Sequence, residues 1–155
     1  MPELNQPAPT FKSPNQDNEI VDLESFKGKK NVILYFYPKD DTPGCTIEAN
    51  GFTALASEFN AADTVVIGVS KDSCESHQAF IDKYGLKVDL LADTTGELCD
   101  AYGVIKEKEW EGKKYMGIAR STFLIDKNGI LVDAIEITGD VTPHPQEMLD
   151  KVRQL

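Results

Sequence analysis

Apolar residues run without interruption through two short segments of the chain. Residues 31–37 read NVILYFY and residues 64–70 read TVVIGVS. A strand with one exposed face alternates apolar and polar residues, whereas a strand covered on both faces does not. The two segments therefore predict buried strands in the middle of a sheet that is covered by helices.

Helical spacing of apolar residues marks other segments. Residues 73–84 predict a helix with Ser73 as N-cap, residues 95–102 predict a short one, and a last helix is expected from Pro145 to the end. Residues 46–59 also predict a helix. Its apolar stripe comprises Ile47, Phe52, Leu55, Ala56 and Phe59.

Turn-forming residues delimit the remaining strands. Residues 10–23 predict an N-terminal hairpin, and residues 121–126 and 130–137 flank an Asn128-Gly129 turn, which is typical of a tight hairpin. A further strand is predicted at 87–92. The resulting alternation of strands and helices predicts an α/β fold with a mixed central β-sheet flanked by helices.

Length and composition indicate one globular domain. The 155 residues are enough to bury a core, and no repeat or linker divides them, so we expect a single domain over residues 1–155. The formal net charge of −10 disfavours binding to nucleic acid or to anionic lipid, because both require clustered lysine and arginine. We therefore expect neither as a partner.

Targeting features and cysteine usage indicate a cytoplasmic protein. No apolar run approaches the roughly 18 residues of a membrane span, and the start MPELNQPAPTF lacks the features of a signal peptide. Three cysteines, Cys45, Cys74 and Cys99, are too few for a disulfide scaffold and lack the spacing of a zinc site. We expect thiols in a reducing compartment, with no metal and no cofactor.

Cys45 lies where a helix is expected to begin. Thr42 occupies the N-cap position, Pro43 the first helical position, and Cys45 the third. Unpaired N–H groups and the helix dipole favour a thiolate there, and the thiolate is the reactive form of cysteine. These residues alone leave two interpretations open, a reactive thiol and a small buried residue at a helix start.

The segment YFYPKDDTPGCTIEA resembles the PxxxTxxC signature of the peroxiredoxins, with Pro38, Thr42 and Cys45 at its three positions. The version present here is similar to the peroxiredoxin Q, or bacterioferritin comigratory protein, subgroup. Further segments, VIGVSKDSCESHQAF and YMGIARSTFLIDKNG, extend the resemblance over nearly the whole chain. It implies a thioredoxin-like fold and a thiol-dependent peroxidase that reduces hydrogen peroxide and organic hydroperoxides through a sulfenic acid on Cys45.

The resemblance also implies roles for four more residues. Arg120 would hold the Cys45 thiolate and donate to the peroxide. Thr42 would offer its hydroxyl to the peroxide while accepting from a backbone N–H of the same turn. Pro38 would shield the sulfur, and Glu48 would orient the arginine. Without the resemblance, Arg120 is interpreted as a surface ion-pair residue and Glu48 as a carboxylate that favours the helix dipole.

The chain differs from its relatives at the resolving cysteine. The usual positions, on the same helix or in the next one, are Asn50 and Ile81. Cys74 is a possible substitute, because two helices that follow neighbouring parallel strands begin at the same sheet edge. A Cys45–Cys74 disulfide would need Cα atoms within about 7 Å. The alternative is a one-cysteine cycle in which an outside thiol attacks the sulfenic acid.

The resemblance implies an external reductant in either cycle, of the thioredoxin type or of the glutathione and glutaredoxin type. We expect a monomer, with a weak dimer as the alternative. Four other residues are assigned no chemistry. We expect His77 to be an exposed or supporting helix residue, His144 a solvent-facing turn residue, Cys99 a packing residue, and Trp110 a partly exposed loop residue.

Two other function classes remain as alternatives. A thioredoxin-like thiol-disulfide oxidoreductase would share the fold but needs a CxxC pair, and Ile47 and Glu48 follow Cys45 instead. A non-enzymatic thioredoxin-fold module would carry a vestigial thiol. The complete set of Pro38, Thr42, Cys45 and Arg120 argues against that loss of activity.

Overall fold

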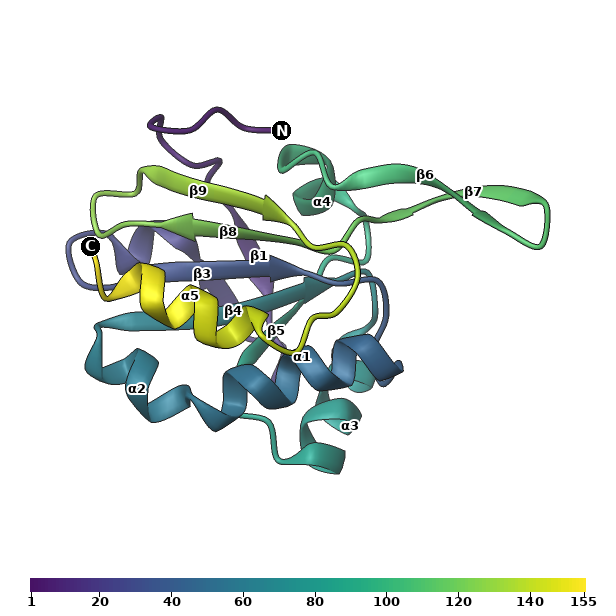
Figure 1. Ribbon diagram of the computed structural model, residues 1–155, viewed down its shortest axis with the longest axis horizontal. Coiled ribbons are helices and arrows are strands. Elements are labelled where there is room, and N and C mark those ends of the chain that lie inside the picture. The colour runs from purple at the N-terminus through teal and green to yellow at the C-terminus, as the bar shows by residue number, and fades with distance from the viewer.

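A five-stranded mixed sheet forms the centre of the computed structural model, which describes residues 1–155. The strands are β3 (Asn31–Phe36), β4 (Thr64–Ser70), β5 (Asp89–Ala92), β8 (Ser121–Ile125) and β9 (Leu131–Glu136). Their order is β5-β4-β3-β8-β9. The pairs β3–β4 and β4–β5 are parallel, whereas β8 runs antiparallel to both β3 and β9 (Figure 1). The predicted mixed sheet is confirmed.

The strand β3 is buried along its whole length, which confirms the prediction from its uninterrupted apolar sequence. Its alternate side chains enter two separate hydrophobic clusters. Val32, Leu34 and Phe36 belong to one cluster, while Ile33 and Tyr35 belong to the other. The sheet therefore separates two cores, and each needs its own cover.

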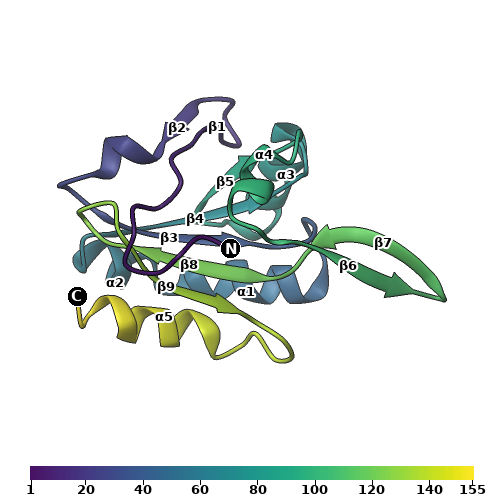
Figure 2. The same ribbon diagram turned by 90° about the horizontal axis from the view of Figure 1, so that it is seen from above.

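Helices cover one face of the sheet and a mixed layer covers the other (Figure 2). The first face packs against helices α1 (Pro43–Ala54), α2 (Ala56–Ala61), α3 (Cys74–Tyr84) and α5 (His144–Val152). The other face is covered by the N-terminal segment and helix α4 (Glu97–Ala101). That segment includes strands β1 (Lys12–Pro14) and β2 (Ile20–Asp22) and the 3₁₀ turn η1 (Leu23–Phe26). No helix combines the length and the apolar character needed to cross a bilayer.

The predicted helix over residues 46–59 is in fact two helices. It starts earlier, at Pro43, and the backbone leaves helical geometry at Leu55, so α2 takes a new direction. Phe52 and Phe59 are both buried, but Ile47 is 46% exposed. The assignment of Ile47 to the apolar stripe was wrong, because the buried face of α1 comprises Cys45, Glu48, Ala49 and Phe52, and Ile47 lies off that face.

Helices α1 and α5 approach each other closely at one glycine. A Cβ atom added to Gly51 would lie 2.7 Å from Cγ of Pro145, which is nearer than van der Waals contact allows. Glycine thus permits the backbone of α1 to rest on the proline ring at the start of α5. This contact anchors the C-terminal half of α1 to the body of the protein.

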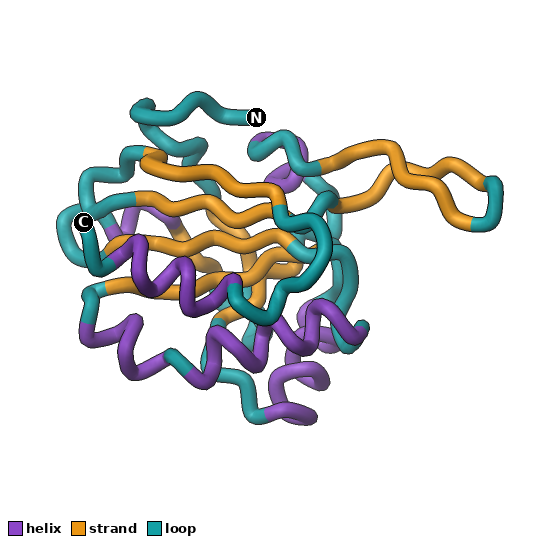
Figure 3. The backbone as a smooth tube through the Cα atoms, viewed as in Figure 1, coloured by secondary structure: helices purple, strands orange, loops and turns teal.

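Residues 105–118 form a hairpin that the sequence did not predict. Strands β6 (Ile105–Trp110) and β7 (Lys113–Ile118) pair antiparallel outside the central sheet and project from the molecule (Figure 3). Their connection places Glu111 and Gly112 at positive φ, as a tight hairpin turn requires. Trp110 is 70% exposed as expected, but on a strand rather than a loop. Because neither face of the hairpin is fully covered, its sequence lacks an apolar strand pattern.

Candidate active site

Cys45 lies in the first turn of α1, at the third helical position, as predicted. Strand β3 ends at Phe36, and a short loop leads to Thr42, whose extended backbone precedes Pro43. The cysteine side chain is 2% exposed. Its sulfur is therefore held near the positive end of a helix and largely shielded from solvent.

Arg120 contacts Cys45 because of the sheet register. The pairing of Phe36 with Ser121 places the residue before β8 beside the end of β3, where the loop to α1 begins. From there Nη2 of Arg120 donates to Sγ of Cys45 at 3.3 Å, and Nη1 donates to Oε1 of Glu48 at 2.6 Å. The structure thus brings together three residues that are up to 75 positions apart.

Glu48 is a buried carboxylate one helical turn after Cys45. It is completely inaccessible to solvent, and its Oε2 has no hydrogen-bond partner. Burial raises the pKa of Glu48 to about 7, although the neighbouring Arg120 acts in the opposite direction. Protonation of Glu48 near neutral pH therefore changes how much negative charge Arg120 faces.

Thr42 and Pro38 lie in the loop that precedes the helix. The Thr42 hydroxyl donates to the carbonyl oxygen of Lys39 at 2.9 Å and makes no capping bond to the helix. The prediction that it accepts from a backbone N–H of the turn was wrong, because the hydroxyl is turned back into the loop. Pro38 is exposed directly after the buried Tyr37.

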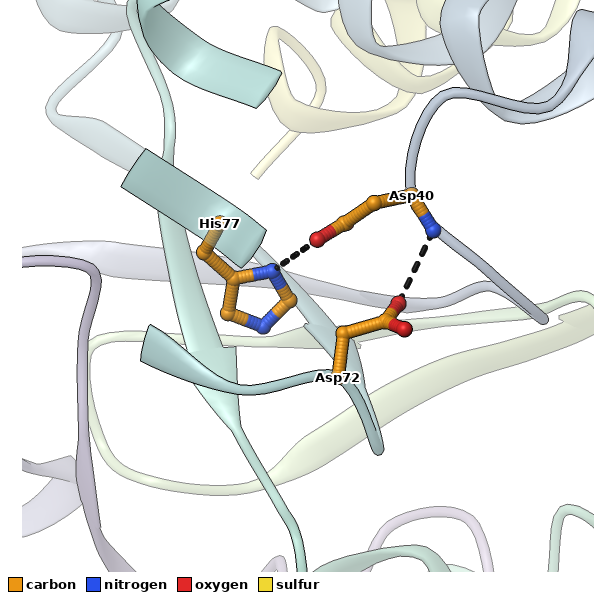
Figure 4. A group of neighbouring side chains, drawn as sticks. All are labelled: Asp40, Asp72 and His77. Atoms are coloured by element: carbon orange, nitrogen blue, oxygen red, sulfur yellow. Dashed lines mark hydrogen bonds and ion pairs between the residues drawn. The ribbon is translucent and has the colours of Figure 1, made fainter. Parts of the chain in front are cut away.

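Asp40 ties this loop to α3 through a buried hydrogen-bond network (Figure 4). Its carboxylate accepts from the hydroxyl of Tyr37 at 2.6 Å and from that of Ser76 at 2.8 Å, and it lies 2.7 Å from Nδ1 of His77. Of the two alternatives expected for His77, the exposed one is wrong, since this side chain is fully buried, whereas a supporting role on the helix agrees with its contact to Asp40. Sequence reasoning missed the role of Asp40, because an acidic residue between strand and helix resembles an ordinary turn residue.

The hydrogen bonds of His77 define where its protons lie. Nε2 is 2.8 Å from the carbonyl oxygen of Leu91, which can only accept, so Nε2 carries a hydrogen. Nδ1 faces the Asp40 carboxylate, and two acceptors at 2.7 Å would repel each other. A hydrogen bond between Nδ1 and the carboxylate therefore links the two side chains.

A third carboxylate, Asp72, completes the group shown in Figure 4. It accepts from the backbone N–H of Asp40 at 2.9 Å and from the Ser70 hydroxyl at 2.7 Å. Asp40, Asp72 and His77 offer donor atoms within 4.8 Å of one another, which is close enough for a metal. Each of those atoms already has a hydrogen-bond partner, so we interpret the cluster as a structural network.

Asp41 attaches the same loop to the C-terminal end of α3. It adopts φ of 56°, a left-handed conformation that aspartate tolerates better than most residues. Its carboxylate accepts from Nζ of Lys83 at 2.7 Å and from the hydroxyl of Tyr84. The loop before Cys45 is thus fastened to both ends of α3.

Cys74 is the first residue of α3, and Cys99 lies in α4. Since β3 and β4 are parallel neighbours, α1 and α3 begin at the same edge of the sheet, as predicted. The partly buried Cys74 sulfur lies 3.9 Å from Oδ1 of Asn18 in the N-terminal hairpin, and all three cysteines are free thiols. Cys99 is buried as expected, and burial together with Asp93 raises the pKa of its thiol.

His144, expected in a solvent-facing turn, is instead buried at the start of α5. Its Nε2 lies 2.8 Å from Oγ1 of Thr122, and burial lowers its pKa to about 4. A turn was expected because Pro143 and Pro145 flank this histidine. They are compatible with the first turn of a helix, where a proline needs no N–H partner.

A surface cavity lies away from Cys45. It measures about 610 Å³ and is lined by residues such as Asn31, Asp63 and Lys127 at the opposite end of β3. Lys127 and Asp63 form an exposed ion pair across it, with 3.1 Å between Nζ and Oδ2. We assign no chemistry to this cavity, because its lining contains no cysteine, serine, threonine or histidine.

The chain that brings Cys45, Arg120 and Glu48 together is similar in sequence to known proteins. The sequence profile of the AhpC/TSA family matches residues 4–134. This chain belongs to that family. A putative peroxiredoxin bcp of Coxiella burnetii is 52% identical over 83% of this chain and 85% of the relative. Peroxiredoxin Bcp of Bacillus subtilis is 48% identical over 84% of this chain and 82% of the relative. The predicted resemblance is therefore confirmed.

Solved structures of related peroxiredoxins share the fold. Peroxiredoxin Q of Xanthomonas campestris superposes with a TM-score of 0.87 at 38% identity, covering 93% of this chain and 90% of that one. Peroxidoxin BcpB of Mycobacterium tuberculosis gives a TM-score of 0.88 at 28% identity, covering 100% and 99%. The thioredoxin-like fold is thus confirmed, and the protein is a thiol-dependent peroxidase of the peroxiredoxin family.

Proposed function

We propose that Cys45 is the peroxide-reducing residue of this peroxidase and that Arg120 is its catalytic partner. The observation that carries the proposal is the double hydrogen bond of Arg120, to Sγ of Cys45 and to the buried Glu48. A guanidinium keeps its charge at every relevant pH and is therefore a permanent donor beside the sulfur.

The reaction follows from this geometry. The Cys45 thiolate attacks one oxygen of the hydroperoxide and forms an S–O bond while the O–O bond breaks. The other oxygen takes a proton and leaves as water or an alcohol, so the products are a sulfenic acid and a reduced leaving group. Negative charge moves from sulfur to the leaving oxygen, and Arg120 can stabilise it at both ends of that path.

The neighbouring residues support this step in different ways. We propose that the Thr42 hydroxyl turns from the Lys39 carbonyl, 2.9 Å away, toward the bound peroxide. Pro38 would cover the approach to the sulfur from its exposed place in the loop. Glu48 would fix the plane of the Arg120 guanidinium through the 2.6 Å bond.

The proposal extends to the substrate class and to the cellular location. A structure of the Xanthomonas campestris bacterioferritin comigratory protein addresses its alkyl peroxide reduction activity. We propose that this chain likewise accepts organic hydroperoxides besides hydrogen peroxide. We also propose that the chain acts in the cytoplasm as a single-domain monomer, and a reducing compartment would keep its three cysteines as thiols.

The test of the proposal is loss of turnover in Cys45→Ser. Peroxide consumption is followed with dithiothreitol as the reductant, for wild type, Cys45→Ser and Cys99→Ser. The first variant is expected to be inactive and the second to retain activity, since Cys99 is a buried packing residue. Turnover that persists in Cys45→Ser would refute the assignment.

Two recycling routes fit the geometry, and one experiment separates them. One equivalent of hydrogen peroxide is added to wild type and to Cys74→Ser, and the intact masses are compared. Loss of two hydrogens with a Cys45–Cys74 crosslinked peptide, absent from the variant, would make Cys74 the resolving cysteine and a thioredoxin-type protein the reductant. Gain of one oxygen on Cys45 in both proteins would mean that an external thiol, of the glutathione or glutaredoxin type, attacks directly.

A further inference from the structure

The hairpin β6–β7 has one face with a composition unlike that of the rest of the protein. Residues directly opposite in an antiparallel pair share a face. The register therefore groups Lys106, Lys108 and Trp110 of β6 with Gly117, Tyr115 and Lys113 of β7. We call these six residues the basic face. It contains no acidic residue, although the whole chain has a formal net charge of −10.

The opposite face of the hairpin differs in charge. It groups Ile105, Glu107 and Glu109 with Ile118, Met116 and Lys114. Lys114 lies 4.0 Å from Glu107, and Ile118 is buried at the base of the hairpin. Only one face therefore combines positive charge with aromatic groups.

Two of the lysines on the basic face have no carboxylate partner. Lys106 forms an ion pair with Glu136 of β9, whereas Lys108 and Lys113 form none within 4.0 Å. Beside them, Trp110 is 70% exposed and Tyr115 is 50% exposed. Exposed aromatic residues gain nothing from folding, and such residues are enriched where proteins bind one another.

The basic face begins next to the reactive cysteine. Strand β7 ends two residues before Arg120, and the hairpin leaves the molecule at the end where α1 begins (Figure 1). Burial and the charge of Arg120 lower the pKa of Lys108, while the sulfur of Cys45 acts in the opposite direction. Lys108 is thus within electrostatic range of the active site, and the face extends outward from there.

We propose that the basic face docks the protein thiol that reduces oxidised Cys45, through an acidic surface surrounding the partner's cysteine. This inference rests on the proposed function, which requires an external reductant at this site. Charge complementarity identifies the partner: unpaired lysines favour carboxylates, and Trp110 and Tyr115 offer apolar contact. An interface of about 800 Å² per partner would extend from Cys45 along the hairpin.

The docked partner would reduce the Cys45 sulfenic acid in two steps, through a mixed disulfide. The partner's thiolate attacks the sulfenic sulfur of Cys45, forms an S–S bond and expels hydroxide, which leaves as water. A second thiol of the partner then attacks the partner's sulfur in the mixed disulfide and releases Cys45 as a thiolate. The partner ends with a disulfide, and the peroxidase is reduced.

The experiment uses the whole protein and two synthetic dithiol peptides. The peptides share one cysteine pair and differ only in flanking residues, which are glutamates in one and lysines in the other. The readout is the ratio of the rates at which the acidic and the basic peptide reduce peroxide-treated protein. This ratio cancels any change in the intrinsic reactivity of the sulfur.

Two features of the protein shift this ratio in opposite directions. A net charge of −10 by itself makes the basic peptide faster, so the ratio falls below one. The basic face makes the acidic peptide faster, and we expect a ratio of about five at low salt that approaches one at high salt. A wild-type ratio below one would overturn the proposal.

Matched variants test whether the hairpin is responsible. Lys108→Gln with Lys113→Gln is expected to bring the ratio below one, and Trp110→Ala is expected to slow both peptides. Lys27→Gln with Lys29→Gln lowers the net charge equally in the turn before β3, at the far end of that strand, and is expected to leave the ratio unchanged. If the hairpin variants keep the wild-type ratio while circular dichroism shows the native fold, the docking site is elsewhere and the proposal fails.

Other occupants of the face give distinct results. If Trp110→Ala dissociates a dimer in analytical ultracentrifugation without affecting either peptide, the face binds a second copy, and the proposal is overturned. If the lysine variants slow only the reaction with an anionic hydroperoxide, the face binds substrate, with the same consequence. Dithiothreitol-supported peroxide consumption tests the proposed function separately, because a small neutral dithiol needs no docking surface.

Discussion

Arg120 serves two acceptors at once, and this double contact sets its expected sensitivity to substitution. Lysine would keep the charge but offers a single ammonium in place of a planar fork. We expect Arg120→Lys to slow the reaction of Cys45 with hydrogen peroxide by about 100-fold, as the loss of one transition-state donor does elsewhere. Stopped-flow measurement of the intrinsic fluorescence of Trp110 or of residual thiol gives the rate. A rate within threefold of wild type would show that the charge alone suffices.

Glu48 makes stability depend on pH. Its pKa is raised by burial from 4.5 in the unfolded chain to about 7 in the folded protein, so between these values the folded state binds more protons. The contribution of Glu48 to the free energy of unfolding is therefore fully present below pH 4.5 and is lost as pH rises through 7. The loss amounts to about 3 kcal/mol. We expect Glu48→Gln to lose that component of the pH dependence. Urea titrations of both proteins between pH 5 and pH 8 measure it, and parallel curves would contradict the prediction.

At the scale of single residues, the sequence predicted where Cys45 lies but not the buried side chains around it. The residue types at Thr42 and Pro43, which are favoured at helix N-termini, predicted a helix start just before Cys45. The structure has a helix start there. His144 was expected in solvent and His77 either in solvent or in a supporting role, yet both are buried. Their burial depends on partners such as Asp40 and Thr122 that are distant in sequence, and no local pattern encodes such pairs.

Among the elements, α3 and the loop before α1 are coupled by the His77–Asp40 pair. Removing His77 takes away one buried hydrogen-bond partner of the Asp40 carboxylate, and a buried polar group left short of a partner costs up to about 3 kcal/mol. We therefore expect His77→Asn to lower the free energy of unfolding by about that amount. Glu75→Gln, an exposed change on the same helix, is the control and should stay within about 0.5 kcal/mol of wild type. Equal denaturation midpoints for the two variants would contradict this coupling.

Elements with a buried face were predictable, and those without one were not. The strands β3 and β4 have uninterrupted apolar sequences because both of their faces are covered. The strand β6 reads IKEKEW, a sequence of charged residues that neither hydrophobic cluster requires. The bend at Leu55 was also missed, because a helical stripe continues through a change of axis when both halves reach the same core.

For the whole molecule, sheet order decides which distant residues meet. The alternation of elements predicted a mixed sheet, but not that β8 would lie next to β3. That neighbour relation places Arg120 at Cys45. The sequence alone connected the two residues only through family resemblance, because the pairing of non-consecutive strands depends on the packing of the entire chain.

The contact between Gly51 and Pro145 bears on how far the helix that carries Cys45 can unwind. Cys45 is nearly inaccessible, so its sulfur must emerge before any thiol can reduce it. We infer that the proline ring holds α1 from residue 51 onward, so that unwinding is confined to residues 43–50. We expect amide hydrogen exchange to be faster at 43–50 than at 51–54, and Gly51→Ala to extend the fast segment to the end of α1. Uniform exchange along α1 in the wild type would contradict this. If the prediction holds, the close packing that glycine permits at position 51 sets the residue at which unwinding of α1 ends.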